Sequence, residues 1–387
     1  NDGPFNWIAG AYFSHTDQKL GQIFVGQDLT DLLDSLFGPA AGPLGPVSYD
    51  YLQKTSDQQL AGFAEVNFDL SDTLELIAGL RVYRLKNTLE ARCTEVTPGI
   101  LCGPDSPRVT ATKTSASPRF TVNFRPNENT TLYATVSRGF RAGGANAAVA
   151  PALGCSLAES VGAIFSPDSV WNYEVGAKVE TADRVLTVNG AAYRIDQKGV
   201  QLAIPDPCGS TFFANAGDAR IDGAELEVNL RPSTHVTFSG QLSYADARFT
   251  DVPAAFGAAA GYAKGDPTPE TPRWKFALSS ELRYPVSDAW ELYARGSWQH
   301  VGKTPFAIDG VVSSGRFRPA YDIANFDVGG ESLAIGGDAR LARQPDRLAG
   351  RIGILHHRPD EAGEAVDRAV QQREAEIDMA EQPVERV

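Results

Sequence analysis

The sequence WNYEVGAKVETADRVLTVNGAAY, from Trp171 to Tyr193, indicates the fold class. From its start, every second residue is aromatic or aliphatic: Trp171, Tyr173, Val175, Ala177 and Val179. The residues between them are polar, charged or glycine: Asn172, Glu174, Gly176, Lys178 and Glu180. An alternation of period two is typical of a β-strand with two different faces. Residues 181–184 separate this run from the next one, as a tight hairpin turn would.

The same alternation recurs along most of the chain. Further runs that show it are residues 60–70, 74–83, 119–125, 225–231, 236–244, 274–284 and 290–299. Counting such runs predicts about twelve strands between Phe5 and about Gly329. Short connections rich in Asp, Asn, Pro and Ser alternate with long ones. In an up-and-down antiparallel sheet, that order puts the tight turns at one end and the long loops at the other.

The length and the polar side of these runs favour a membrane barrel over a soluble β-protein. The runs extend over about 10–15 residues, enough to cross a bilayer at a tilt, whereas soluble strands are commonly about 5–6 residues long. Glu, Lys and Arg recur on the polar side, and a small closed core would bury them without partners. Aromatic residues collect near strand ends, as they do in membrane-interface girdles: Trp7, Tyr12, Phe13, Trp171, Tyr173, Trp274, Tyr284, Trp290 and Trp298. The apolar side would then meet lipid, and the charged side a wet lumen.

Composition argues against several other classes. The chain has 387 residues, of which 42% are hydrophobic, so it does not have a disordered composition. No window holds about 18 consecutive apolar residues, and a transmembrane helix is therefore not expected. The net charge of −13 argues against a nucleic-acid-binding surface. Because the chain begins at Asn1 and has one methionine, Met379, we expect a piece of a longer protein whose signal peptide would lie upstream.

Five segments resemble, in the right order, strands of the TonB-dependent outer-membrane receptors. They are QLAGFAEVNFDLSDTLELIAGLRVYR (59–84), TLYATVSRGFRAGGAN (131–146), NYEVGAKVE to LTVNGAAYRIDQKGVQ (172–201), NAGDARIDGAELEVNLRPSTHVTFSGQLSYADARFTD (215–251) and TPRWKFALSSELRY (271–284). The resemblance extends over about residues 5–330. It implies a barrel of about 22 strands around a plug domain, in the outer membrane of a Gram-negative bacterium. It also implies coupling to the TonB–ExbB–ExbD complex through the plug, and uptake of a ferric siderophore or a similar scarce ligand.

The chain departs from this family pattern at both ends. The sequence given does not include the plug, the TonB box and about eight N-terminal strands that the resemblance implies. After NFDVGGES (325–332) the alternation stops, and the last residue is Val387 instead of Phe or Trp. We therefore expect an all-β fold in residues 1–332, a partial transmembrane antiparallel up-and-down β-barrel with about 12 of the 22 implied strands. Residues 333–387 are expected to form a non-barrel tail, helical or disordered, produced by a frameshift or present as a genuine appendage.

No catalytic, cofactor or metal-binding constellation is predicted. Acid pairs such as Glu225 and Glu227 share one strand face, whereas glycosidase chemistry needs opposed carboxylates. RAGGAN (141–146) leads from a strand into a long loop without the helix that a phosphate-binding loop requires. An enzyme is therefore the least supported class.

Candidate ligand-binding residues lie where the long loops leave the strands. Arginine and lysine could meet anionic siderophore groups, and aromatic rings could stack on catechols or sugars. The candidates are Arg138, Arg141, Asn146, Phe212, Phe213, Trp298, His300 and Lys303. For each of them, the alternative is an ordinary role as a girdle aromatic or as a hydrogen-bonded lumenal side chain.

The four cysteines, Cys93, Cys102, Cys155 and Cys208, lie in the predicted long loops. An oxidising exterior would allow disulfides there. The short spacing favours Cys93 with Cys102, which leaves Cys155 with Cys208. Free thiols are the alternative.

These observations predict an outer-membrane receptor and transporter barrel that takes up a scarce ligand with energy coupling. A ferric siderophore is the favoured ligand. A passive porin-like channel and a soluble β-rich surface or adhesion module are the two alternatives. No motif in the sequence identifies the substrate.

Overall fold

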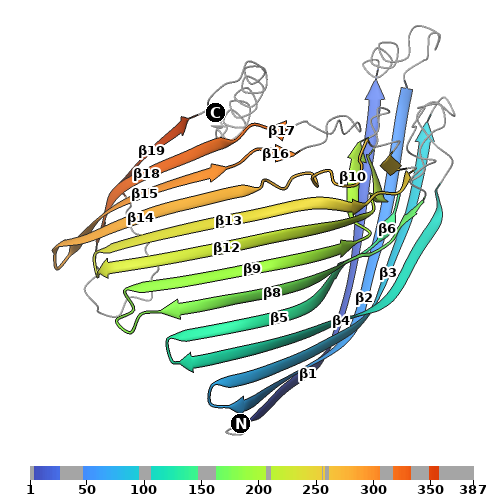
Figure 1. Cartoon of the computed structure of the whole chain (residues 1–387). Coiled ribbons are helices and arrows are strands. Elements are labelled where there is room, and N and C mark those ends of the chain that lie inside the picture. The colour runs from blue at the N-terminus through green and yellow to red at the C-terminus, as the bar shows by residue number, and fades with distance from the viewer. Residues whose placement is uncertain are drawn as a thin grey trace, which may run out of the picture.

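The computed structural model describes residues 4–26, 47–95, 106–146, 163–205, 211–254, 256–257, 261–305, 317–332 and 348–356. Figure 1 shows them as one long, curved antiparallel sheet with small two-stranded ribbons at one end. Within these ranges, no helix has both the length and the apolar character needed to cross a membrane.

Thirteen strands of the described chain form the main sheet. They are β1 (Phe5–Gly26), β2 (Val47–Ser71), β3 (Leu74–Glu95), β4 (Ser106–Asn127), β5 (Thr130–Arg141), β8 (Asp168–Glu180), β9 (Leu186–Lys198), β12 (Asp218–Ser233), β13 (Val236–Asp251), β14 (Trp274–Ser287), β15 (Trp290–Val301), β18 (Tyr321–Ser332) and β19 (Leu348–His356). Three ribbons pair β6 (Gly144–Ala145) with β7 (Ile164–Phe165), β10 (Gln201–Pro205) with β11 (Thr211–Asn215), and β16 (Thr304–Pro305) with β17 (Phe317–Arg318).

Each strand of the main sheet pairs antiparallel with the next one along the chain, and β1 and β19 end the row. The short turns at residues 72–73, 128–129, 181–185, 234–235 and 288–289 lie along one rim, and the ribbons lie at the other (Figure 1). The predicted all-β, up-and-down topology is therefore confirmed, and twelve strands of the main sheet lie between Phe5 and Ser332.

The register gives the sheet two chemically different faces. Leu226, Leu242 and Phe276 are cross-strand partners on one side, which we call the apolar face. Ser239, Ser279 and Ser297 are partners on the other side, the polar face. Large side chains stand free on the apolar face, where Phe13 is 68% exposed and Trp7 is 64% exposed. A soluble protein does not leave so much contiguous apolar surface in water, so this face fits lipid.

Two cross-strand pairs on the polar face put a tyrosine ring over a glycine. Tyr133 is the partner of Gly176, and Tyr193 is the partner of Gly223. A Cβ at Gly176 would lie 2.6 Å from the Tyr133 ring, and one at Gly223 would also collide with its tyrosine. Only glycine therefore leaves room for the ring, which in turn covers backbone that lacks a side chain.

The loop end of β5 lies against the polar face of β3. The ring of Phe140 stacks on that of Tyr83, with centroids 3.6 Å apart. Tyr83 belongs to a small buried cluster with Ala61 and Leu85, against which Phe140 packs. This contact brings the end of β5 and the segment that follows it over the first four strands, where the candidate site lies.

One feature differs from the expectation of a tail outside the barrel. Residues 348–356 form β19, which pairs antiparallel with β18 from Asp322↔His356 to Gly330↔Leu348. The free edge of β18 offers unpaired backbone groups, and the backbone of LAGRIGILH (348–356) pairs with them. The rest of 333–387 lies outside the described residues, so its separate character and its frameshift origin stay predictions.

Replacing Leu278 by Arg tests which face meets lipid. Leu278 is 54% exposed on the apolar face, and Arg there would have to enter hydrocarbon. We expect Leu278→Arg to lower the free energy of unfolding by about 2–4 kcal/mol. Ser279→Arg, which points to the polar face, is the matched control and should cost much less. Refolding equilibria in lipid vesicles measure both values, and equal losses would contradict the assignment.

Candidate ligand-binding site

Charged side chains on the polar face pair with one another. Glu75 accepts hydrogen bonds from Asn123 at 2.8 Å and from Arg125 at 2.7 Å. Farther along the sheet, Glu281 accepts bonds from Arg283 and Arg295, each at 2.5 Å. Paired charges at this density fit a water-filled interior, as the alternation predicted.

Asp168, the first residue of β8, organises the loop end of β5. Its side chain is 1% exposed. Its carboxylate accepts hydrogen bonds from the backbone N–H of Arg141 (3.0 Å), from Arg141 Nε (2.8 Å) and from Gln197 Nε2 (2.8 Å), and Arg141 Nη2 also binds it. A buried carboxylate needs several donors of this kind. Arg141 is thus tied to Asp168, although 56% of its side chain is exposed.

Asn146 joins two of the ribbons. Its Nδ2 donates to the carbonyl of Phe213 at 2.8 Å, and its Oδ1 accepts from the N–H of Phe213 at 2.8 Å. The side-chain amide thereby reproduces the pair of bonds that a neighbouring strand would make. The Phe213 ring lies 5.4 Å from the Phe165 ring, and Phe212 is buried, with 3% of its surface exposed.

Two further amide side chains hold the same segment. Asn215 Nδ2 donates to the carbonyls of Ser166 (2.9 Å) and Gly199 (2.8 Å), while its Oδ1 accepts from the Ser166 N–H at 2.6 Å. Gln201 Nε2 donates to the carbonyls of Ala142 and Ser166, each at 3.0 Å. Residues 142–146 and 163–168 therefore have a defined position over the sheet.

The Gly143–Gly144 pair allows this segment to pack tightly. A Cβ at Gly143 would collide with the backbone of Phe165, and one at Gly144 would lie 2.7 Å from the Phe165 ring. The RAGGAN sequence thus serves close backbone approach between β6 and β7.

A cavity of about 440 Å³ lies between this segment and the polar face of β1–β4. Two cross-strand rows form its floor. One row is Thr16, Asp57, Asn87 and Ala111, and the next is Ser14, Gln59, Leu85 and Lys113. Ala142, Gly143 and residues 164–167 line its other side. The cavity therefore combines hydroxyl, amide, carboxylate and ammonium groups with the ring of Phe165.

Asn87 is fixed within this cavity. Its Nδ2 donates to Asp57 Oδ1 at 2.7 Å. Its Oδ1 is buried and has no hydrogen-bond partner within the described part of the protein. An unpaired buried acceptor is costly, so this oxygen is available to a donor on a ligand or a water molecule.

The structure gathers some of the predicted ligand residues and separates others. Arg141, Asn146, Phe212 and Phe213 share the loop-end cluster described above. Arg138 lies between β5 and β4, where its Nη1 donates to the Ala116 carbonyl at 3.3 Å.

The other three candidates lie on β15 or just beyond its end. Trp298 is on the apolar face, opposite Leu278. His300 shares that face, and its Nδ1 lies 2.9 Å from Asp322 Oδ1. Lys303 is exposed just beyond the end of β15. Ligand contact stays a prediction for all eight candidates.

Sequence reasoning did not find the cavity floor or Asp168. Asp57, Asn87 and Lys113 come from three different strands, and nothing in their local sequence sets them apart. The available signal was their parity, because each faces the polar side in the half of its strand nearer the long loop. That signal applies equally to many other residues, so only the register selects these three.

Cys93 lies in β3, and Cys102, Cys155 and Cys208 lie outside the described residues. The predicted disulfides therefore stay predictions. Among the residues that the structure describes, no group of three or more His, Cys, Asp or Glu side chains is arranged to hold a metal ion.

Replacing Asp168 by Asn tests its role in the loop end. The variant keeps the shape of the side chain but removes the charge that Arg141 binds. We expect amide hydrogen exchange in residues 142–146 and 163–168 to quicken about tenfold or more, which corresponds to losing about 1.5 kcal/mol of local stability. Asp183→Asn, in a short turn, is the control. Unchanged exchange in the Asp168 variant would contradict this role.

Comparison with known families and proteins agrees with this architecture. Residues 2–336 match the family model described as TonB dependent receptor-like, beta-barrel. The ferrichrome outer membrane transporter/phage receptor of Escherichia coli is 37% identical over 89 residues, which is 23% of this chain and 12% of that protein. The probable TonB-dependent siderophore receptor PiuA of Acinetobacter baumannii is 26% identical over 132 residues, 33% of this chain and 17% of that protein.

Solved structures share the fold. The ferric yersiniabactin uptake receptor FyuA from Yersinia pestis aligns with a TM-score of 0.64 at 18% identity, over 86% of this chain and 46% of that one. PiuA from Acinetobacter baumannii aligns with a TM-score of 0.56 at 17% identity, over 87% of this chain and 48% of that one. The chain thus spans about half the length of these structures. It belongs to the TonB-dependent receptor family, as part of the β-barrel of an outer-membrane protein of a Gram-negative bacterium.

Proposed function

We propose that this barrel belongs to a receptor that takes up a ferric siderophore across the outer membrane. Family membership supports an outer-membrane receptor. Relatives with the names ferrichrome transporter and siderophore receptor support an iron-chelate ligand. A metal-pseudopaline receptor of Pseudomonas aeruginosa, 27% identical over 139 residues, extends the range of related ligands to other metal chelates.

The observation that carries the proposal is the cavity under residues 142–143 and 164–167. It lies against the polar face at the end of the sheet where the long connections gather, which is where an external solute would enter. Its floor offers the Lys113 ammonium and several neutral donors to the oxygens of a chelate. Phe165 adds a ring that can pack on a catechol or hydroxamate group.

Energy coupling is the second part of the proposal. The protein would work with the TonB–ExbB–ExbD complex through a plug domain inside the barrel. The paired charges on the polar face, such as Glu281 with Arg283 and Arg295, give this interior the hydrophilic lining that a plug and a polar solute need.

Uptake by living cells tests the function directly. Iron-limited cells that express the complete receptor would be offered radioactive iron on hydroxamate, catecholate and carboxylate siderophores in turn. We expect accumulation from at least one class, and loss of that accumulation in a strain without TonB. Accumulation that persists without TonB would favour a passive channel, and no accumulation from any class would contradict the siderophore assignment.

Lys113 gives the proposal a residue-level test. Lys113→Gln removes the ammonium group from the cavity floor, and we expect it to weaken siderophore binding about tenfold, or about 1.4 kcal/mol. Lys54→Gln is the matched control, because Lys54 is exposed and has the opposite parity to Asp57 on β2. Binding to whole cells measures both. Equal siderophore affinity of the Lys113 variant and the parent protein would contradict binding of the ligand in this cavity.

A further inference from the structure

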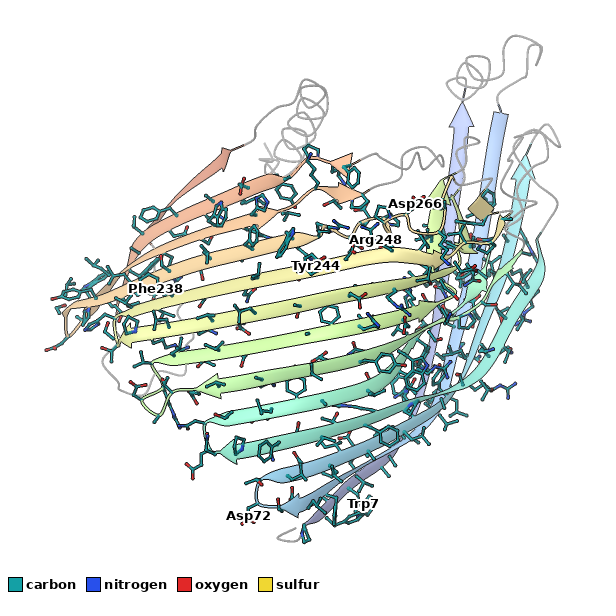
Figure 2. The ribbon with its side chains drawn as sticks, viewed as in Figure 1. Trp7, Asp72, Phe238, Tyr244, Arg248 and Asp266 are labelled. Carbon is teal, nitrogen blue, oxygen red and sulfur yellow. The ribbon has the colours of Figure 1, made fainter. Side chains whose placement is uncertain are left out.

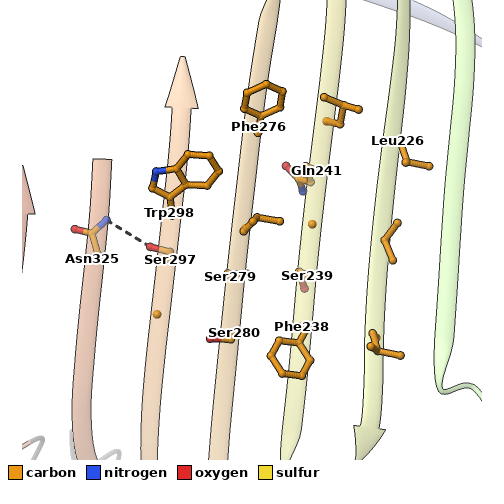
Figure 3. A pocket seen from close by; sticks show the side chains of 16 residues that line it. Leu226, Phe238, Ser239, Gln241, Phe276, Ser279, Ser280, Ser297, Trp298 and Asn325 are labelled. Atoms are coloured by element: carbon orange, nitrogen blue, oxygen red, sulfur yellow. Dashed lines mark hydrogen bonds between the residues drawn. The ribbon is translucent and has the colours of Figure 1, made fainter. Parts of the chain in front are cut away.

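The apolar face is not uniformly convex, since it carries a depression of about 920 Å³ across β12–β15. The three residues that β12 contributes are Leu226, Val228 and Leu230, all of apolar-face parity. Phe238, Phe276 and Trp298 contribute from β13, β14 and β15 (Figure 3). The depression therefore opens on the side that faces lipid, away from the ligand cavity.

Small residues create this depression. Gly240 lies opposite Leu278, and Ser280 lies opposite Gly296. A Cβ added at Gly296 would lie 3.5 Å from Ser280 Oγ, so the position could hold a larger side chain. The large side chains of Phe238, Leu278 and Trp298 surround these small residues. The surface over the small residues is therefore recessed relative to the large side chains.

An aromatic pair continues the same face toward the long-loop end. Tyr244 and Trp274 are cross-strand partners, and their ring centroids lie 4.7 Å apart. They follow directly after Leu242 and Phe276, which line the depression. Aromatic rings on the outside of membrane proteins are enriched at the boundary between the hydrocarbon core and the lipid head groups.

Two arginines lie beyond this pair and share one carboxylate. Arg273 Nη2 donates to Asp246 Oδ1 at 2.7 Å, and Arg248 Nε lies 3.1 Å from both oxygens of Asp246. Two positive charges against one negative charge leave the trio with a net charge of +1. Both guanidinium groups reach solvent, with side-chain exposures of 43% for Arg248 and 52% for Arg273. Figure 2 shows Phe238, Tyr244 and Arg248 in succession along β13.

The other charged side chains at this height on β9 and β12 form pairs. Asp266, which follows the Gly265 carbonyl that Arg248 Nη1 binds at 2.9 Å, accepts a hydrogen bond from the Ala263 N–H at 2.8 Å. Arg194 pairs with Asp222 at 2.6 Å, and Arg220 pairs with Asp196 at 2.7 Å. Each of these two pairs is neutral. Among these paired side chains of β9, β12 and β13, together with Arg273 just before β14, the one net positive charge is therefore centred on Arg248 and Arg273.

We propose that this face binds a membrane lipid with a phosphorylated head group. The phosphate would lie against Arg248 and Arg273, and an acyl chain would occupy the depression past Tyr244 and Trp274. Leu242 and Asp246 are four residues apart, or about 14 Å along a strand, which suits a lipid that spans head-group and hydrocarbon layers. Arginine forks bind phosphate oxygens in pairs, and basic clusters at the membrane surface attract anionic lipids. The site depends on the barrel being in a membrane and not on which solute the lumen carries.

The test compares two probes that differ only in the phosphate. Dimyristoyl phosphatidic acid and dimyristoylglycerol would each be titrated into the complete protein in detergent micelles, and bound lipid counted by native mass spectrometry. We expect phosphatidic acid to bind more tightly. Arg273→Gln should weaken it about fivefold, which corresponds to about 1 kcal/mol, and leave dimyristoylglycerol unchanged. Arg273→Lys should retain most of the affinity, which a folding defect would not allow.

A second pair of variants examines the acyl chain. Gly296→Leu fills the depression and should weaken both lipids, whereas Gln299→Leu, on the polar face of the same strand and outside the depression, should change neither. Equal affinity for the two probes, or no effect of Arg273→Gln, would overturn the proposal. If Gly296→Leu changes the oligomeric state and leaves lipid binding intact, the depression contacts a second copy and the proposal fails. Siderophore uptake should be unaltered by these substitutions, which separates failure of this proposal from failure of the transport function.

Discussion

Within a lipid bilayer, every backbone N–H and C=O group must find its partner inside the protein. The antiparallel ladder from β1 to β19 meets this requirement for the interior strands, because each pairs with the next along the chain. The edges of β1 and β19 carry groups that the ladder leaves unpaired, and in a membrane such edges need further strands. Residues 348–356 meet this requirement for β18 by pairing with it along its edge.

Strand geometry then determines on which face of the sheet each side chain lies. Because successive residues point to opposite sides of a strand, one register produces an apolar face and a polar face with different solvents. The aligned serines on β13, β14 and β15 and the aligned leucines and phenylalanine on β12, β13 and β14 follow from the same ladder. The cavity and the depression differ in their linings for the same reason. The cavity against β1–β4 offers hydrogen-bonding groups, and the depression across β12–β15 offers hydrocarbon and aromatic surface.

Outside the main sheet, hydrogen bonds from side chains take the place of the backbone hydrogen bonds between strands. The segments around β6, β7, β10 and β11 are too short to pair extensively, and buried or amide side chains hold their backbones instead. Asp168, Asn146 and Asn215 each make several such bonds. Polar residues used in this way define a position without the bulk of a hydrophobic core, which suits a site that must remain open to a solute.

The sequence by itself determined the strand content, the strand order and the two faces, since these depend only on period two and on turn chemistry. The run from Trp171 to Tyr193 forms β8 and β9 with the expected parity, and the short turns lie at one rim. Tertiary structure alone decided which distant residues meet. Arg141 binds Asp168 across a long connection, Phe140 crosses onto Tyr83, and Thr16, Asp57 and Asn87 form one row from three strands. Periodicity specifies the direction of a side chain within its own strand, whereas its neighbours depend on register, bending and loop packing between segments far apart in the chain.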